Sequence, residues 1–256
     1  MTLMTLFGCI LIAFGPAAVI FLVAVARDHF HVIIMISSAF FWLLSLLLSS
    51  IWWTIVSPLK KDLAFGVAFS VLFQELLRYA FFLLIKKAED SELVSLASKS
   101  SGLFKHKTAF VSGLGYGIMS GLFAMVNVLA DITGPGAPGL DGESPQFLII
   151  SALLTCAFVL LNTFWGIIWF ESCSRKKYAY LALVFGSHMF VSLMTLLNNR
   201  KHYLGSMMSA YIVLIIMAVL AFKVAGGSLQ NLRSALARKQ RPQMHNEDVT
   251  VVSPTT

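Results

Sequence analysis

Charged side chains are scarce in this sequence. Lys, Arg, Asp and Glu together make up 12% of the 256 residues, whereas hydrophobic residues make up 58%. A single globular core at this chain length could not shelter so many apolar side chains from water. The composition therefore excludes a water-soluble globular protein and predicts a chain that lies in lipid.

Cysteines are few and the common catalytic motifs are missing. Cys9, Cys156 and Cys173 make no disulfide framework. The sequence has no HExxH, GxSxG or CxxC motif, and no two aspartates face each other from separate apolar runs, as an intramembrane aspartyl protease requires. The acid-Arg-aromatic triplet and the Asn-Pro-x-x-Tyr motif of rhodopsin-like receptors are absent as well. We therefore predict no catalytic residues, no metal site and no cofactor.

Seven apolar runs reach the roughly 20 residues that a helix needs to cross about 30 Å of hydrocarbon. The runs are 3–26, 32–56, 63–85, 108–130, 147–170, 178–197 and 204–225. Each is continuously apolar instead of alternating, which favours helices over a β-barrel. The predicted fold class is therefore an all-α membrane protein with seven transmembrane helices.

The positions of Lys and Arg predict how the chain crosses the membrane. The tail and the connections after the first, third and fifth runs hold most of these residues, and the other side holds Lys60, Lys61, Arg200 and Lys201. Cytoplasmic loops are enriched in Lys and Arg, so we predict a lumenal or extracellular N-terminus and a cytosolic C-terminus. The same distribution accounts for the net charge of +7 without a nucleic-acid partner.

Residues 1–232 are predicted to form one seven-helix transmembrane domain. Within it, residues 86–107 are polar and charged and indicate a solvated cytosolic loop, and residues 131–146 form a lumenal loop rich in Gly and Pro. Residues 233–256 are polar, and we predict a disordered cytosolic tail there.

Three glycines, Gly113, Gly117 and Gly121, recur at intervals of four in the fourth run. On a helix they lie nearly above one another and open a groove free of side chains, into which another helix can press closely. That helix belongs either to another subunit or to this chain, and the spacing does not decide between the two. A phosphate-binding loop is excluded, because no strand precedes these glycines and no Lys-Ser/Thr pair follows them.

Five polar residues of interest lie inside the apolar runs: Gln74, Glu75, Arg78, Asn162 and His188. An ionised side chain at the centre of a membrane costs on the order of 3 kcal/mol. Glu75 and Arg78 are three residues apart on one helical face and are able to pair, either to fix packing or to line a path for protons or a substrate. For His188 we expect backbone carbonyls and the amide of Asn162 as partners, because a lone histidine without further ligands at suitable spacing does not indicate a metal site.

Short motifs occur in order from the first apolar run to the end of the seventh. They are Phe7-Gly8-Cys9, Ala13-Phe14-Gly15-Pro16, Ala39-Phe40-Phe41-Trp42-Leu43, Gln74-Glu75 with Arg78, Val111-Ser112-Gly113-Leu114-Gly115, Leu129-Ala130-Asp131 with Gly134-Pro135-Gly136, Thr163-Phe164-Trp165, Ser187-His188 and Ala225-Gly226-Gly227-Ser228. Together they resemble the anterior pharynx defective subunit family of the gamma-secretase complex. The likeness leaves out the third connection and the tail after about Leu232.

The resemblance implies a non-catalytic scaffold of seven helices. Such subunits form an early subcomplex with nicastrin and then stabilise presenilin, which supplies the catalytic aspartates, alongside the presenilin enhancer subunit. The complex processes type I membrane proteins, as in Notch signalling. The implied partners are these three proteins and membrane lipid, and the implied locations are the endoplasmic reticulum, Golgi, plasma membrane and endosomes. The family's glycine ladder matches Gly113, Gly117 and Gly121.

Two positions depart from the family's pattern. His188 matches one of two intramembrane histidines of the family, but Asn162 stands at the position of the other. Asparagine can make hydrogen bonds but cannot carry a proton near neutral pH, so the resemblance does not support a His–His proton or metal site here. Glu143 stands where the family usually has aspartate, which keeps the charge.

A protein of another class is the alternative. A seven-helix receptor or transporter would use the buried Glu75 and Arg78 pair. It predicts a ligand pocket or ion flux in the purified chain alone, whereas the scaffold interpretation predicts instability without partners.

Overall fold

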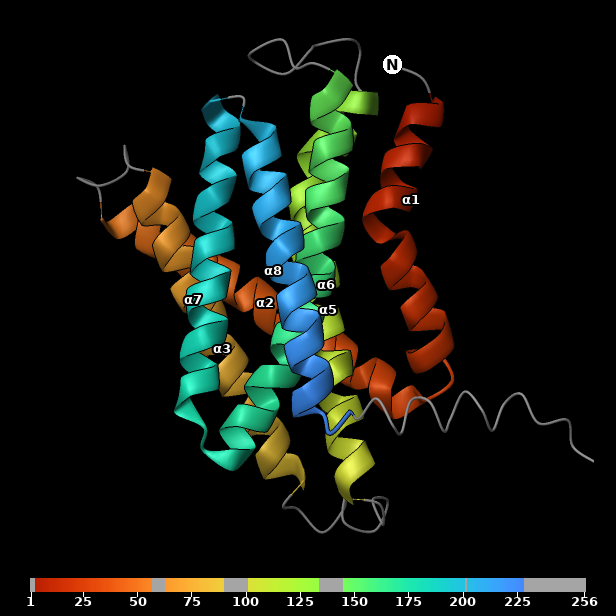
Figure 1. Ribbon diagram of the computed structural model, residues 1–256, viewed down its shortest axis with the longest axis vertical. Coiled ribbons are helices and arrows are strands. Elements are labelled where there is room, and N and C mark those ends of the chain that lie inside the picture. The colour runs from red at the N-terminus through yellow and green to blue at the C-terminus, as the bar shows by residue number, and fades with distance from the viewer. Residues whose placement is uncertain (1–2, 57–62, 90–100, 134–144, 201, 228–256) are drawn as a thin grey trace, which may run out of the picture. The chain divides into compact units, whose positions relative to one another are not determined.

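A computed structural model describes residues 3–56, 63–89, 101–133, 145–200 and 202–227 of the chain (Figure 1). The elements are α1 (Leu3–Ile20), η1 (Phe21–Val25), α2 (His29–Ile55), α3 (Leu63–Glu89), α5 (Ser101–Thr133), α6 (Pro145–Arg175), α7 (Tyr178–Met194), η3 (Thr195–Arg200) and α8 (Tyr203–Val224). The described residues contain no strand, which confirms the predicted all-α class. The chain divides into two units, Met1–Ala225 and Gly226–Thr256, and the first contains all of these helices.

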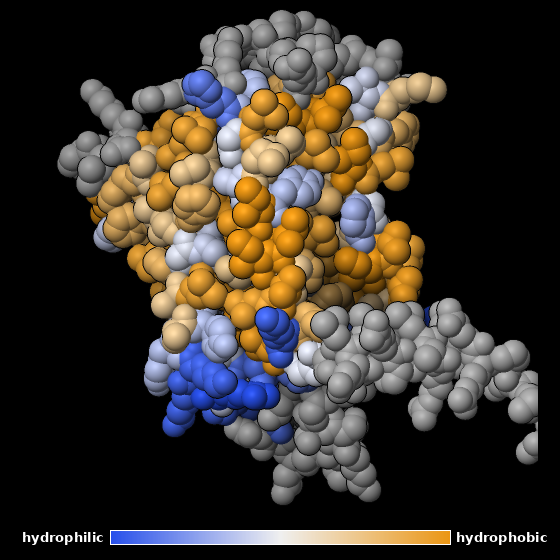
Figure 2. All heavy atoms as spheres, in the orientation of Figure 1, coloured by the Kyte–Doolittle hydropathy of each residue, from blue (hydrophilic) through white to orange (hydrophobic). Residues whose placement is uncertain are grey.

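Seven of the described helical segments are long and apolar enough to cross a membrane. They are Met4–Val25, His29–Ile55, Leu63–Glu89, His106–Val126, Phe147–Arg175, Tyr178–Asn198 and Tyr203–Val224. The predicted number of spans is therefore confirmed, and the chain is an integral, multi-pass membrane protein. Figure 2 shows apolar side chains over most of the visible face, with hydrophilic side chains gathered at its lower end. The orientation of the termini remains a prediction.

The helices extend further into the connections than the sequence predicts. Helix α3 continues to Glu89 and α5 begins at Ser101, so both ends of the predicted loop 86–107 are helical. Similarly, α5 continues to Thr133 and α6 begins at Pro145, inside the predicted loop 131–146. The lysines mark the edge of the apolar region, but the backbone hydrogen bonds of a helix do not need lipid and continue past it. Residues 90–100, 134–144 and the predicted tail 233–256 lie outside the described residues.

Helices α5 and α6 form the centre of the bundle. In their most apolar windows 56% of the residues are buried, against 17–28% in the other five spans. The α5–α6 pairing is the most extensive one, and α5 also contacts α1 and α2 while α6 contacts α1, α7 and α8. The third span, α3, packs mainly against α2 and α7. Five spans therefore present much of their surface to lipid or to partners, and two are enclosed by the chain itself.

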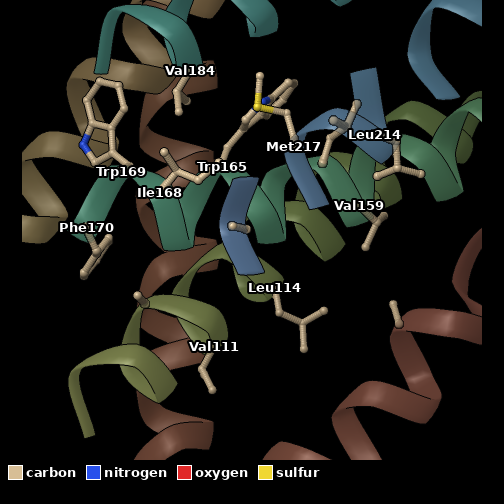
Figure 3. Packing of buried hydrophobic residues seen from close by; sticks show 14 of the residues in the cluster. Val111, Leu114, Val159, Trp165, Ile168, Trp169, Phe170, Val184, Leu214 and Met217 are labelled. Atoms are coloured by element: carbon tan, nitrogen blue, oxygen red, sulfur yellow. The ribbon is translucent and has the colours of Figure 1, made fainter. Parts of the chain in front are cut away.

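Apolar side chains from all seven spans fill the interior around α5 and α6. Figure 3 shows Val111 and Leu114 of α5, Val159, Trp165, Ile168, Trp169 and Phe170 of α6, Val184 of α7, and Leu214 and Met217 of α8. A second cluster attaches α1 to the ends of α5 and α6, through Cys9, Ala13, Met125, Leu148 and Ala152. The first cluster also contains Phe81 and Phe82 of α3, so it helps to position α3 and α7 against α6.

Candidate functional site

Glu75 and Arg78 lie at the centre of α3 and form a buried ion pair. Arg78 Nε is 3.2 Å from Glu75 Oε2, and the two residues are 2% and 3% exposed. Their spacing of three residues places both side chains on one helical face, as the sequence indicates. The contact is an ion pair without hydrogen-bond geometry, because neither Nε nor Oε2 has a hydrogen-bond partner. The other atoms of the two groups make the hydrogen bonds that hold the pair in place.

Asn162 of α6 receives the free edge of the Arg78 guanidinium. Arg78 Nη2 donates to Asn162 Oδ1 at 2.6 Å, and Nη1 donates to the Asn162 backbone oxygen at 3.3 Å. The Asn162 amide in turn donates to Ser120 Oγ and to the Phe158 carbonyl. The guanidinium also lies over the Tyr116 ring, with its central carbon 4.6 Å from the ring centroid. Arg78 thus joins α3 to both α5 and α6.

His188 of α7 contacts the Glu75 carboxylate on the side away from Arg78. Its Nδ1 lies 2.7 Å from Glu75 Oε1, which places the ring proton on Nδ1 as the donor to the carboxylate. The ring stacks on Trp165, with centroids 4.4 Å apart. The expected partner for His188, the Asn162 amide, is therefore wrong. Asn162 is turned toward Arg78 and Ser120, and the Glu75 carboxylate is the stronger acceptor for the imidazole N–H.

Gln74 forms a separate polar link next to this network. Its Oε1 accepts a hydrogen bond from Trp42 Nε1 and its Nε2 donates to Ser70 Oγ, both at 3.2 Å. The Gln74 backbone oxygen accepts from the Tyr116 hydroxyl at 2.6 Å. The structure thereby brings all five sequence-selected polar residues into one region, joined by Trp42, Ser70, Tyr116, Ser120 and Trp165. None of the latter five was predicted as a site residue. Trp42 and Trp165 belong to the motifs that carry the family resemblance, Tyr116 lies between ladder glycines, and Trp165 lies one turn after Asn162.

A cavity of about 380 Å³ lies beside the network. It is lined by Trp42, Val67, Ser70, Val71, Gln74, Ser120, Ala124, Ser151, Leu154, Thr155, Phe158, Asn162, His188, Ser192 and Thr195. Hydroxyls and amides make up about half of this list, so water molecules would find several hydrogen-bond partners there. The lining extends from Asn162 and His188 toward Val67, near the start of α3, and Thr195, just after α7. Those helix ends belong to one edge of the bundle, the one predicted to be lumenal.

Cysteine labelling measures whether water reaches this cavity. With the three native cysteines replaced, Ser192→Cys is expected to react with a charged, membrane-impermeant thiol reagent added on the lumenal side, because the residue lines the cavity near the end of α7. The matched variant Leu72→Cys, 44% exposed on α3 and absent from the cavity lining, should react far more slowly, since a thiol in lipid does not ionise. Equal labelling of the two positions, or none at Ser192→Cys, would contradict a water-accessible cavity.

The glycine ladder is occupied by α6 of the same chain. A Cβ atom on Gly113 would lie 2.7 Å from the backbone oxygens of Asn162 and Thr163, and one on Gly117 would lie 2.5 Å from the Val159 oxygen. At Gly121 a Cβ would meet the Val159 side chain at 2.8 Å. Among the described helices, α6 therefore fills the groove that the sequence left open to either kind of partner.

Two further glycines also lie at close helix contacts, one at this contact and one between α5 and α2. Gly166 of α6 faces the ladder, because a Cβ there would lie 2.7 Å from the Gly113 Cα. Gly115 lies on another side of α5, where a Cβ would overlap the Met35 oxygen and the Ser38 hydroxyl of α2. Neither residue was predicted from the sequence to have a packing role. The signal for Gly166 is its position four residues after Asn162, on the same face of α6.

The chemistry of the network is that of a neutralised polar core. One carboxylate is balanced by one guanidinium and one imidazole N–H, and among the described residues no thiol and no second carboxylate hydrogen-bonds to it or pairs with it. The described residues hold no cluster of three or more His, Cys, Asp or Glu side chains that could bind a metal ion. The arrangement links α3, α5, α6 and α7, and borders a polar cavity at His188 and Asn162.

Comparison with known proteins finds relatives of one family that match nearly the whole chain. A family model described as "Aph-1 protein" matches residues 4–228. The chain is 44% identical to gamma-secretase subunit Aph-1b of Danio rerio over 250 residues, which cover 94% of this chain and 96% of that protein. It is 46% identical to gamma-secretase subunit Aph-1 of Drosophila melanogaster over 233 residues, covering 91% and 98%. Identity to gamma-secretase subunit APH-1B of Homo sapiens is 41% over 245 residues, covering 92% and 94%.

Proposed function

Because the chain belongs to the Aph-1 family, we propose that it is a non-catalytic scaffold of gamma-secretase that binds and stabilises presenilin and nicastrin during assembly. A role as a gamma-secretase subunit follows from relatives that carry this name and match the chain almost end to end. The proposal also includes the presenilin enhancer subunit as a partner. It extends to the processing of type I membrane proteins, and to the endoplasmic reticulum, Golgi, plasma membrane and endosomes as locations.

The observation that carries the scaffold role is the use of the buried polar groups for packing. Glu75, Arg78, Asn162 and His188 hold α3, α6 and α7 together by contacts of 2.6–3.3 Å. A group that catalyses proton or acyl transfer needs access to a substrate atom within hydrogen-bond reach. Here the Glu75 carboxylate is 3% exposed and already faces Arg78 and His188. The network therefore supports a rigid bundle more than a reactive centre.

The surfaces available to partner helices lie on the outer spans. Because α6 fills the glycine ladder, we propose that Gly113, Gly117 and Gly121 support assembly indirectly, by holding α5 against α6. Large apolar side chains remain exposed on the outer spans, including Leu11 and Val19 of α1 and Ile212 and Ile215 of α8. These outward faces are suited to lipid or to helices of other subunits.

Affinity capture tests this function. A tagged chain expressed in cells and purified in mild detergent is expected to retain presenilin, nicastrin and the presenilin enhancer subunit, as identified by mass spectrometry. The purified chain alone, reconstituted without presenilin, is expected to cleave no type I membrane substrate. Capture without presenilin and nicastrin would contradict the scaffold role, and cleavage by the chain alone would contradict the non-catalytic assignment.

The cavity favours one alternative, a transporter. A polar cavity that reaches buried Asn162 and His188 resembles the entrance of a substrate or proton path. On this alternative, proteoliposomes that contain only this chain would dissipate an imposed proton or cation gradient, and His188→Phe would abolish the flux. On the scaffold proposal the same vesicles hold the gradient as well as vesicles without protein.

A further inference from the structure

A small pocket lies where α6, α7 and α8 meet, at the edge of the bundle opposite the cavity. Its volume is about 170 Å³, several times the roughly 30 Å³ that one water occupies in the liquid. The lining residues are Glu171, Ser172, Arg175, Lys177, Tyr180, Leu220, Lys223 and Val224. Neither the polar network nor the glycine ladder contributes to this pocket.

A tight turn between α6 and α7 fixes one wall of the pocket. Lys176 adopts the left-handed conformation, with φ of 56°, directly after the last residue of α6. The Lys177 N–H then donates to the Ser172 carbonyl at 2.9 Å, which is the backbone pattern of a Schellman motif. The Lys177 ammonium lies 5.8 Å from the centroid of the Tyr180 ring. The turn therefore fixes the backbone of Lys177, and the Tyr180 ring lies next to its ammonium group.

The pocket carries an excess of positive charge. Arg175 is paired with Glu171, so these two charges cancel. Among the described residues, Lys177 and Lys223 form no ion pair, and both are exposed. Two uncompensated ammonium groups on the walls of one small pocket repel each other unless an anion lies between them. The positive-inside distribution of lysine explains charges at this edge but does not require them to share a pocket.

The pocket lies on the border between apolar and hydrophilic surface. In Figure 1 the turn between α6 and α7, which contains Lys177, lies at the lower end of the bundle, and Figure 2 shows hydrophilic side chains gathered at that end, directly below apolar side chains. Leu220 and Val224 of α8 line the same pocket. Leu220 lies one turn before the end of α8, and Val224 is its last residue. Phe222, between them in the sequence, is 40% exposed. Phospholipid phosphates lie at this depth of a bilayer, with acyl chains on the apolar side.

We propose that this pocket binds the phosphate group of an acidic glycerophospholipid. Lys177 and Lys223 supply the compensating charge, and the Tyr180 hydroxyl is a further hydrogen-bond donor on the pocket wall. The acyl chains lie along the apolar surface of α8 that continues from Leu220 and Val224. A soluble phosphate ester would gain the same ionic contacts but not the burial of its chains against this surface.

Lipid retention by the full-length chain, purified with its co-expressed subunits, tests the proposal. The preparation is placed in phosphatidylcholine nanodiscs that contain a minor fraction of phosphatidic acid, and the lipids retained on this chain are counted by native mass spectrometry. The wild-type chain is expected to retain phosphatidic acid in preference to phosphatidylcholine. Lys177→Gln and Lys223→Gln should each weaken this retention about fivefold, because each lysine near a charged lipid surface contributes on the order of 1 kcal/mol.

The matched control is Lys107→Gln. Lys107 is exposed at the same edge, since its neighbour His106 contacts Glu171 at 3.9 Å, but it does not line the pocket. This variant should retain phosphatidic acid as the wild type does, and all variants should melt at the wild-type temperature. Equal losses in Lys107→Gln and Lys177→Gln would overturn the pocket assignment. Glycerol 3-phosphate that displaces phosphatidic acid at equal concentration would overturn the assignment to a lipid.

Discussion

Replacing Arg78 by methionine is expected to lower the free energy of unfolding by about 3–5 kcal/mol, the range for removing one partner of a buried ion pair. Methionine occupies similar space but cannot balance Glu75 or donate to Asn162. The Glu75 carboxylate would remain 3% exposed, with His188 as its remaining polar contact. We expect a lower melting temperature in detergent and a lower yield of assembled complex.

Two control variants separate the buried charge from charge in general. The double variant Glu75→Gln/Arg78→Met removes both charges and should recover most of the lost stability, because neither is then left unpaired. Lys87→Met removes one positive charge from an exposed position on α3 and should stay within about 0.5 kcal/mol of the wild type. A normal melting temperature for Arg78→Met would show that the ion pair does not stabilise the bundle.

The second large effect is expected at the glycine ladder. Gly117→Ala should destabilise the chain by about 3 kcal/mol, at the upper end of the range for overpacking. The added Cβ would lie 2.5 Å from the Val159 oxygen and 3.0 Å from the Val159 Cα, and these backbone atoms cannot rotate away. Helices α5 and α6 must therefore separate along their contact. Gly117→Leu should prevent recovery of presenilin and nicastrin with the chain.

Gly186→Ala is the matched control for this prediction. Gly186 also lies inside a helix, α7, but a Cβ there would have no heavy atom within 4 Å beyond its chain neighbours and the adjacent backbone of its own helix. Alanine favours a helix by about 1 kcal/mol relative to glycine, so this variant should be at least as stable as the wild type. Melting temperatures and complex yields of the two alanine variants, measured side by side, check the prediction. Similar values would mean that α5 and α6 do not depend on close approach at Gly117.

The number of spans and the family were predictable from the sequence, for different reasons. A bilayer sets the length of each apolar run, so counting such runs gave the seven spans that the structure contains. Co-linear motifs from Phe7 to Ser228 indicated the family that the comparisons confirm. The ends of the helices were less predictable, because hydropathy falls at Lys86 while the backbone of α3 remains helical to Glu89.

Only some of the contacts between the polar residues were predictable from the sequence. Glu75 and Arg78 are neighbours on one helix, so helical geometry alone makes their contact available. His188 is 113 residues from Glu75, and Asn162 is 84 from Arg78. Which of two acceptors a distant histidine meets depends on how α6 and α7 are rotated about their axes, and apolar runs carry little information about that rotation. The glycine spacing likewise identified a groove but not α6 as the helix inside it.

The separation of these partners along the chain also sets an order for biogenesis. Synthesis proceeds from the N-terminus, so α3 is made before Asn162 of α6 and His188 of α7, and until these follow, Arg78 and Glu75 have only each other within this network. The glycine ladder of α5 likewise lacks its partner helix until α6 is made. The nascent chain therefore passes through a stage with unsatisfied polar groups in lipid, at which quality-control factors of the insertion machinery have the most to recognise.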